Sequence, residues 1–326
     1  MSEIENVLGV TQSPIADGLG SYALRMEHVL GPENILSIVM DKTLKNQKFI
    51  GNIRFGYFPP ITNGWSLNLH LARRIINVSV RDRKLVHYFT PLFIPIRRSD
   101  IAKAVTIHDT YYRYYNNKKI AKLTRKFRDF ENIISISNQT KHELVDDGFA
   151  EDSISVIYHY IPDIFRNTNN DRSLQDGKSI VLTVGDGPHK NNAIISKALK
   201  EKYYHIHIGK EKVGDENLTN LSLDTMVSLY NRAHVFVRMS SVEGFGYPVL
   251  EALFCGTPVV TTDLPVFREI IGDAGVHAKL EADSIVSSIE YAIENRDYLL
   301  GEFARIKKNY TIDTFIKNLY RFYKNT

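Results

Sequence analysis

The sequence contains almost no cysteine. Cys255 is the only one among 326 residues, so the chain forms no internal disulfide and no cluster of thiolate metal ligands. We therefore expect a reducing, cytoplasmic setting. The sequence also lacks a run of the ~18 apolar residues that a membrane-spanning helix requires. Its first ten residues, MSEIENVLGV, lack the basic and then apolar layout of a secretory signal.

A large excess of one charge is also missing, because 41 Lys and Arg residues against 37 Asp and Glu residues leave a formal net charge of +4. The basic residues nevertheless concentrate in the first half of the chain, in segments 73–84, 97–98 and 118–128. This bias favours an anionic partner such as the inner face of a membrane, with which the protein would make peripheral contact. Solvated helix faces are the alternative, and nucleic acid is not an expected partner.

Short apolar runs alternate with longer helical patterns along the whole chain, as is typical of parallel sheets covered by helices. In the first half we expect strands at Val7–Thr11, Ile35–Met40, Ile53–Phe58, Leu85–Phe89, Ala104–Ile107, Ile133–Ile136 and Ser155–Tyr158, and helices at Tyr22–Leu30 and Ile120–Phe130. In the second half we expect strands at Ser179–Val184, Tyr204–Ile208, His234–Val237 and Pro258–Thr261, and helices at Ala193–Lys200, Leu223–Ala233, Pro248–Cys255 and Asp313–Tyr323.

The fold class is therefore α/β, with two Rossmann-like, doubly wound domains that face a cleft. A polar stretch, RNTNNDRSLQDGK, separates the two halves and is typical of a linker. We predict an N-terminal domain over residues 1–166, a linker over 167–178 and a C-terminal domain over 179–310. Residues 311–326 form a terminal helix that can pack back on the N-terminal domain.

The most informative segment is SVEGFGYPVLEALFCGTPVVT, residues 241–261. Its glycines let a loop turn sharply after a buried strand, and Pro248 suits the first turn of a helix. The loop would present the backbone amides of Phe245, Gly246 and Tyr247 at the positive end of that helix. Such a place binds a phosphate or a sugar hydroxyl.

Two carboxylates belong to the same segment, Glu243 in the loop and Glu251 one turn inside the helix. A carboxylate can accept hydrogen bonds from both hydroxyls of a vicinal diol, which suits a ribose or a donor sugar. Two glutamates at this spacing also occur by chance, so they indicate a site only as part of the whole string.

Residues 243–252 and 256–258 match the motif Glu-Gly-Phe-Gly-x-Pro-x-x-Glu-Ala followed by Gly-x-Pro. In this the sequence resembles the family-4 retaining glycosyltransferases, which have the GT-B fold. The resemblance implies that Glu243 contacts the transferred sugar and that Glu251 holds the nucleotide ribose. It also implies that the N-terminal domain binds the acceptor and the C-terminal domain binds the nucleotide-sugar donor.

A second element of the resemblance is TVGDGPHKNN, in which Gly185 follows a strand and Lys190 precedes a helix. A lysine here can neutralise a diphosphate as a compact cation; a solvent-exposed lysine beside a turn is the alternative. Many family members carry an arginine directly after this glycine. Asp186 takes its place here, which leaves one expected phosphate cation unaccounted for.

Two further elements lie in the first half. Asp17-Gly18-Leu19-Gly20 resembles the family's first glycine-rich loop, with Asp17 in place of one glycine, and implies that Gly18 and Gly20 border the donor. His108 and Asp109 follow an expected strand, and the resemblance implies that His108 contacts the donor sugar. Simple loop glycines and a structural polar pair are the alternatives.

The resemblance implies transfer of a hexose-type sugar, with retention of anomeric configuration, from a UDP- or GDP-linked donor to a glycan or lipid acceptor. His108, Glu243 and Lys190 are the candidate catalytic residues. No Asp-x-Asp metal motif is evident, so we expect no metal and no cofactor besides the nucleotide-sugar substrate. A nucleotide-sugar epimerase, a phosphorylase, a DNA-modifying glycosyltransferase and a non-catalytic GT-B protein are the alternatives. An NAD-linked oxidoreductase is disfavoured, because no complete Gly-x-Gly-x-x-Gly follows a strand.

Overall fold

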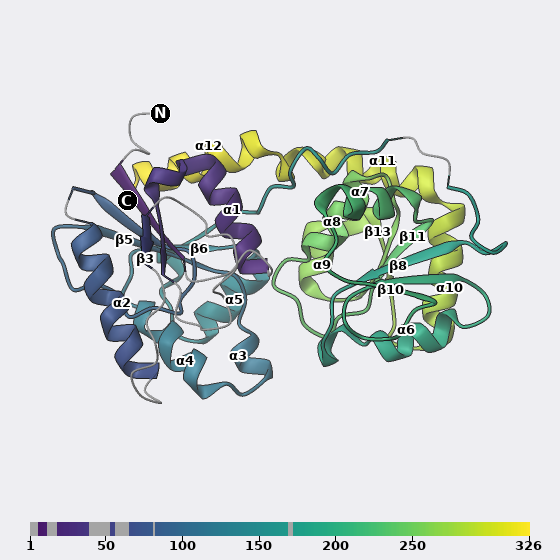
Figure 1. Ribbon diagram of the computed structural model, residues 1–326, viewed down its shortest axis with the longest axis horizontal. Coiled ribbons are helices and arrows are strands. Elements are labelled where there is room, and N and C mark those ends of the chain that lie inside the picture. Colours follow the sequence, from purple (N-terminus) through teal and green to yellow (C-terminus); the bar gives the residue numbers. More distant parts are fainter. Residues whose placement is uncertain (1–5, 12–17, 39–52, 56–64, 81, 169–171) are drawn as a thin grey trace. The chain divides into compact units, whose positions relative to one another are not determined.

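Two α/β units make up the chain in the computed structural model (Figure 1): Met1–His159 with Phe315–Thr326, and Tyr160–Thr314. The structure describes all residues except 1–5, 12–17, 39–52, 56–64, 81 and 169–171. The division falls after His159, seven residues earlier than expected. The expected linker, 167–178, lies within the second unit, where the Arg172 guanidinium donates to the carbonyl oxygens of Ala233 at 2.9 Å and Gly256 at 2.8 Å.

The first unit contains a seven-stranded parallel sheet in the order β3-β2-β1-β4-β5-β6-β7. Its strands are β1 Val7–Thr11, β2 Ile35–Ile38, β3 Ile53–Phe55, β4 Leu85–Tyr88, β5 Ala102–Ile107, β6 Asn132–Ser135 and β7 Ile154–Val156. The seven expected strands are thus present, and the expected ends of two of them, Val39–Met40 and Gly56–Phe58, lie outside the described residues.

The helices of the first unit are α1 Gly18–Leu30, α2 Trp65–Ser79, α3 Tyr111–Tyr114, α4 Lys118–Thr124, α5 Asn138–Asp146 and α12 Ile312–Lys324. The helix expected at Ile120–Phe130 is wrong in extent, because α4 ends at Thr124 and a 3-10 turn, η4, follows at Arg125–Phe127. The Asn117 side chain accepts from the Ile120 amide and caps α4, which begins at Lys118, two residues earlier than expected.

Strand alternation gives the first sheet two different faces. Leu8, Val86, Tyr88 and Val105 face a buried apolar core that also contains residues of α2 and α5. On the opposite face His87 is buried, and its Nδ1 hydrogen-bonds to the Tyr323 hydroxyl of α12 at 2.6 Å. The C-terminal helix therefore joins the first unit through a partly buried polar contact.

The second unit contains a six-stranded parallel sheet in the order β10-β9-β8-β11-β12-β13. Its strands are β8 Ile180–Val184, β9 Tyr204–Ile208, β10 Glu216–Leu218, β11 Val235–Arg238, β12 Val259–Thr262 and β13 Gly275–Ala278. The chain runs outward from β8 through β9 to β10 and then returns to place β11 on the other side of β8. Ligands of doubly wound sheets bind outside the carboxyl ends of the strands at such a reversal.

Helices cover both faces of the second sheet, with α6 packed against α10 and α7 packed against α8 (Figure 1). They are α6 Asn192–Leu199, α7 Leu223–Arg232, α8 Tyr247–Phe254, α9 Pro265–Ile270, α10 Ala282–Glu294 and α11 Arg296–Ile306. Among the described residues, no helix combines the length and the apolar character needed to cross a bilayer.

We expect Tyr323→Phe to destabilise the first unit, because the buried Nδ1 of His87 loses a hydrogen-bond partner. Leaving a buried polar group unsatisfied costs about 1–3 kcal/mol. Urea unfolding measures this free energy. The matched control is Tyr298→Phe, whose side chain is 55% exposed, and which we expect to change stability by less than about 0.5 kcal/mol. Equal stabilities of the two variants would contradict the proposed contact.

Candidate functional site

The loop after β8 is shaped by residues with positive φ. Gly185 has φ 91°, Gly187 has φ 116° and Asn191 has φ 56°, a region that glycine and asparagine tolerate best. Between them lies the 3-10 turn η6, Pro188–Lys190. The loop therefore turns sharply at the carboxyl end of the strand and directs Lys190 inward, where it is buried.

The loop after β11 lies directly against this first loop. The Asn191 side-chain amide donates to the Met239 carbonyl and to the Ser241 hydroxyl, both at 2.7 Å. The Ser241 amide donates to the His189 carbonyl at 2.8 Å. These bonds hold together two segments that the sequence separates by about fifty residues, as the hydrogen-bonded positions 191 and 241 show.

The carboxylate of Glu243 is the centre of the site. Its Oε2 accepts from the Lys190 ammonium at 3.0 Å, from Arg238 Nε at 3.1 Å and from the Ser240 hydroxyl at 2.9 Å. A terminal nitrogen of the Arg238 guanidinium, Nη2, lies 3.1 Å from the same oxygen. The side chains of Glu243, Lys190 and Arg238 are at most 10% exposed. The structure thus brings together Lys190 and Glu243, two of the three candidate catalytic residues.

The surroundings of Glu243 keep it ionised. Burial by itself raises the pKa of this carboxyl, but the charges of Arg238 and Lys190, together with hydrogen bonds from Lys190 and Ser240, lower the pKa from 4.5 to about 2. The site therefore holds a carboxylate and two cations at neutral pH.

The loop after Glu243 leads into α8 through a glycine that no other residue can replace without strain. Gly246 precedes the helix with φ 93°, and a Cβ placed on it would lie 2.8 Å from Cε1 of Phe267. Pro248 occupies the first turn of α8, as expected. The segment that carries the amides of Phe245, Gly246 and Tyr247 is thereby fixed at the amino end of this helix.

Glu251 lies on α8, apart from the Glu243 cluster. Its Oε2 accepts a hydrogen bond from the hydroxyl of Tyr230 at 3.0 Å. Tyr230 is fully buried, and burial followed by the charge of Glu251 raises the pKa of its hydroxyl well above the ordinary value of 10.0. Tyr230 therefore stays a neutral donor and orients the carboxylate of Glu251.

Asp186 has a structural environment of its own. Its carboxylate accepts from the amides of Lys210 at 2.8 Å and Glu211 at 3.0 Å, and lies 3.3 Å from His207 Nε2. Burial alone would raise the pKa of Asp186, but these hydrogen bonds lower it below the ordinary value. Asp186 thus holds the loop after β9 against the loop after β8.

His108 lies in the first unit at the end of β5. Its Nε2 donates to the Phe89 carbonyl at 2.8 Å, and its ring stacks on that of His159 with 5.4 Å between centroids. Asp109, the next residue, accepts from the Tyr111 amide at 3.0 Å. The histidine is thus held in one orientation by its neighbours, and its contact with a donor sugar stays a prediction.

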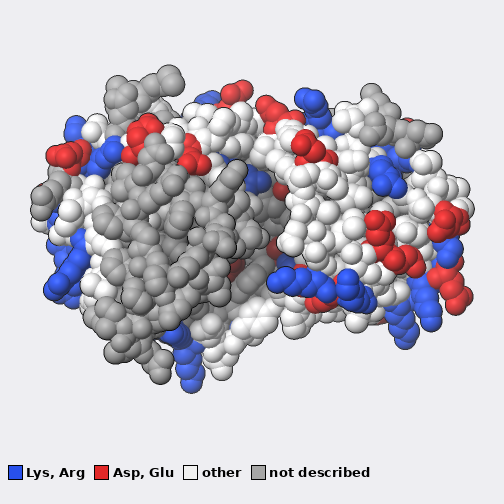
Figure 2. All heavy atoms as spheres, in the orientation of Figure 1, with Lys and Arg blue, Asp and Glu red and all other residues white. Residues whose placement is uncertain are grey.

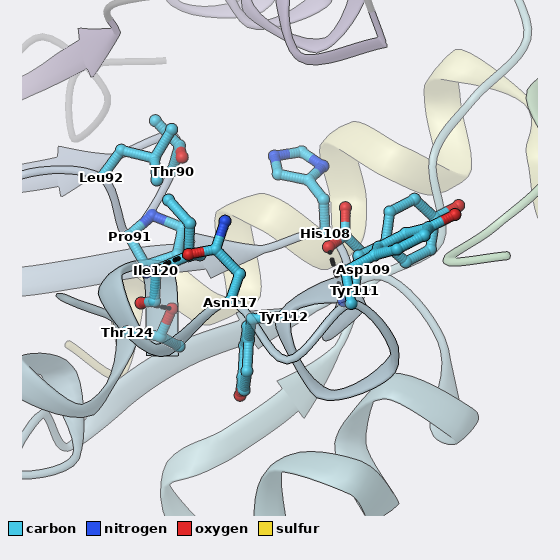
Figure 3. Close-up of a pocket in the computed structure, with 11 residues that line it drawn as sticks. Thr90, Pro91, Leu92, His108, Asp109, Tyr111, Tyr112, Asn117, Ile120 and Thr124 are labelled. Atoms are coloured by element: carbon cyan, nitrogen blue, oxygen red, sulfur yellow. Dashed lines mark hydrogen bonds between the residues drawn. The ribbon is translucent and has the colours of Figure 1, made fainter. Parts of the chain in front are cut away.

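A pocket of about 250 Å³ adjoins His108 (Figure 3). Thr90, Pro91 and Leu92 form one side, whereas His108, Asp109 and Tyr111 form the other. The remaining lining residues are Tyr112, Tyr115, Asn117, Ile120 and Thr124. Three tyrosines of segment 111–115, Tyr111, Tyr112 and Tyr115, therefore line this pocket.

Gly18 and Gly20 open α1 in the first unit, as the sequence places them, whereas Asp17 lies outside the described residues. Their role at the donor stays a prediction. Within the described part of the chain, no three His, Cys, Asp or Glu side chains are grouped as a metal site requires. Metal independence likewise stays a prediction.

Lysine and arginine are interspersed with acidic side chains on the face drawn in Figure 2. Five basic residues on and directly after α4 are exposed, namely Lys118, Lys119, Lys122, Arg125 and Lys126. The basic bias of the first half of the sequence therefore includes a solvent-facing group. Its contact with a membrane stays a prediction.

Arg238 is the charged site residue that sequence reasoning missed, and Ser240 and Tyr230 were missed with it. It ends β11 and is buried, 6% exposed. Charged residues are rarely buried without a partner, so an arginine that ends an apolar strand five residues before Glu243 was a usable signal. Which carboxylate it meets depends on how the loop folds back, and the spacing alone does not determine that.

Comparisons with known proteins bear on the fold and on the class of enzyme. Residues 200–311 match the sequence family described as Glycosyl transferases group 1. The chain is 26% identical over 270 residues to the O-antigen chain mannosyltransferase RfbU of Salmonella typhimurium, covering 74% of each protein. It is 41% identical over 68 residues to the O-antigen chain mannosyltransferase B of Escherichia coli, covering 21% of this chain and 18% of the relative.

Two solved structures share the fold over nearly the whole chain. HepE from Anabaena, in complex with UDP and glucose, has a TM-score of 0.79 at 16% identity and covers 99% of this chain and 100% of its own. Sucrose-phosphate synthase from Thermosynechococcus elongatus has a TM-score of 0.80 at 13% identity and covers 98% of each chain. These findings confirm the expected GT-B fold and, with the sequence matches, support a glycosyltransferase.

We expect Glu243→Gln to lower stability at neutral pH, since it removes the negative charge that two buried cations contact. Removing one partner of a buried ion pair costs about 3–5 kcal/mol. Because the folded pKa lies below 4.5, the ionised carboxylate stabilises the fold above that pH, and this contribution is lost as the pH falls towards about 2. The difference between wild type and variant should therefore shrink below pH 4.5.

Denaturant unfolding at pH 7 and near pH 3.5 measures the effect. Glu290→Gln is the control, because its exposed ion pair with Lys202 contributes at most about 1 kcal/mol. A difference between wild type and Glu243→Gln that does not change between the two pH values would contradict the low pKa.

Proposed function

We propose that the chain is a retaining, metal-independent glycosyltransferase that moves a hexose-type sugar from a nucleotide diphosphate sugar to a glycan or lipid acceptor. One observation carries the proposal. The buried Lys190–Glu243 pair lies at the carboxyl ends of β8 and β11, next to the start of α8. The same strands flank the reversal of the chain order, where doubly wound sheets bind their ligands.

The chemistry follows from the charges at this place. When the bond between sugar and diphosphate breaks, the sugar becomes positive and the leaving diphosphate gains negative charge. Lys190 and the amino end of α8 are fixed in position before the reaction, so they can stabilise the leaving group by electrostatic preorganisation. The ionised Glu243 carboxylate can accept hydrogen bonds from the sugar hydroxyls. We do not assign it the role of covalent nucleophile.

Glu251 is proposed to hold the ribose. The carboxylate can accept from both ribose hydroxyls, and the buried Tyr230 hydroxyl fixes its orientation. A group that is already oriented loses less side-chain freedom on binding.

The similar proteins indicate which donor nucleotides and which sugar to test first. Two of them are named as O-antigen mannosyltransferases, which makes mannose the first sugar to test. UDP is bound in the HepE structure, which supports testing uridine donors. Guanosine donors are included because the sequence resemblance implies a UDP- or GDP-linked sugar.

The aromatic pocket beside His108 is our candidate for contacts with a glycan or lipid acceptor, since tyrosine faces pack against sugar rings and acyl chains. The exposed basic group on α4 supports peripheral contact with an anionic membrane.

Donor binding and transfer test the proposal directly. A donor that binds only the folded protein at a hundred times its Kd stabilises it by about 2.7 kcal/mol, so thermal shift against UDP-, GDP- and ADP-linked sugars identifies the donor. With that donor, we expect Lys190→Ala to lower transfer about a hundredfold or more, on the scale of a lost oxyanion contact.

The matched control for this variant is Lys202→Ala, which removes an exposed lysine paired with Glu290 and should transfer at the wild-type rate. Wild-type turnover by Lys190→Ala would contradict the role of Lys190. The anomeric configuration of the product, measured by NMR, tests retention.

Metal independence has its own test. Because Lys190 and the helix end supply positive charge at the diphosphate, we expect full transfer activity after treatment with EDTA. The measurement is the transfer rate with and without EDTA, with Mn²⁺ added back as the control. A strict requirement for Mn²⁺ would contradict this part of the proposal.

A further inference from the structure

The residue after Gly185 cannot serve as a phosphate cation here. It is Asp186, and its carboxylate is already bound by the amides of Lys210 and Glu211 and by His207. Glu211 is a second carboxylate that contacts this part of the chain, and it accepts from the Gly187 amide at 2.8 Å and from Asn192 at 2.9 Å. Both acids are therefore used to hold the loops of β8 and β9 together.

Arg238 reaches the same place from the neighbouring strand. One of its terminal nitrogens, Nη1, donates to the carbonyl of Val184, the last residue of β8. A Cβ placed on Gly185 would lie 3.4 Å from this nitrogen. The guanidinium therefore lies directly beside the backbone of Gly185, on the strand pair that flanks the reversal of the sheet.

Two cations meet at the carboxylate of Glu243. Arg238 and Lys190 both contact one oxygen, Oε2, of this carboxylate. Their positive groups therefore lie close together at the ends of β8 and β11. Two cations held at one place can act together on the negative charge of a diphosphate.

The geometry of the guanidinium leaves donors for such an anion. Arginine has five N–H groups in a planar fork. Among the described residues, Nε and Nη2 contact Glu243 and Nη1 contacts Val184. These contacts account for three of the five N–H groups. One N–H on each terminal nitrogen is left, and two such groups can hold a phosphate through paired hydrogen bonds.

We propose that Arg238 is the second cation of the diphosphate site and binds the phosphates together with Lys190. The inference rests on the proposed function and assigns it a further substrate-binding residue. Arg238 is supplied from the end of β11, whereas Asp186 positions the loop after β9.

Calorimetric titration of UDP, GDP and ADP, against uridine, guanosine and adenosine, tests this inference. We expect Arg238→Gln to weaken binding of the nucleoside diphosphate roughly tenfold to a hundredfold, as for loss of a charge-assisted hydrogen bond. Binding of the nucleoside should change by less than about twofold, because Arg238 is assigned to the phosphates alone. Arg238→Lys keeps the charge but loses the paired N–H groups of the guanidinium. Its affinity for the nucleoside diphosphate should therefore fall between those of the wild type and Arg238→Gln.

Arg268→Gln is the control, since Arg268 is half-exposed and pairs with Asp263; its affinity should equal that of the wild type. Circular dichroism checks that each variant is folded, and Arg238→Lys carries the test if Arg238→Gln does not fold. If the wild type binds a nucleoside diphosphate and the folded Arg238 variants bind it equally well, the inference on Arg238 is overturned and the proposed function stands. If the wild type binds none of UDP, GDP and ADP, both fall.

Discussion

A single buried carboxylate oxygen organises the second unit. Oε2 of Glu243 receives Lys190 from the loop after β8, and Arg238 and Ser240 from the end of β11. None of these charged groups could be buried alone, because removing an ion from water costs several kcal/mol that only a partner charge offsets. Each loop therefore depends on the other for its conformation, and the arrangement exists only when both strands are in place.

The sheet order explains why these two loops meet. Strands β8 and β11 are neighbours although β9 and β10 lie between them in the sequence. Since both strands run in parallel, their carboxyl ends emerge at the same edge of the sheet, and the Asn191 amide can bridge from one loop to the other. Gly246 then turns the chain into α8 at the same edge. Fold and site are thus consequences of one topological reversal.

The environment of Asp186 shows how an acidic residue can occupy a position in this loop while its side chain binds a neighbouring loop. An acid at this position would repel a diphosphate if it faced the ligand. Two backbone amides and His207 hold its carboxylate at the loop after β9 instead, while Arg238 brings positive charge from the next strand. The arginine expected after Gly185 is absent from the local sequence. In the folded chain two cations, Lys190 and Arg238, nevertheless contact Glu243.

What the sequence determined by itself was local. The strand Tyr204–Ile208 was predicted to the residue, and Gly246 was placed in the loop before a helix, because glycine conformation, helix starts and strand periodicity depend on neighbours within a few positions. Lys190 and Glu243 became candidates through the resemblance of their motifs. The ion pair of Arg238 with Glu243, its bond to Val184 across 54 positions and the contact of Tyr230 with Glu251 were decided only by the tertiary structure. The physical reason is that such contacts depend on which strands lie side by side, and a linear spacing does not contain the sheet order.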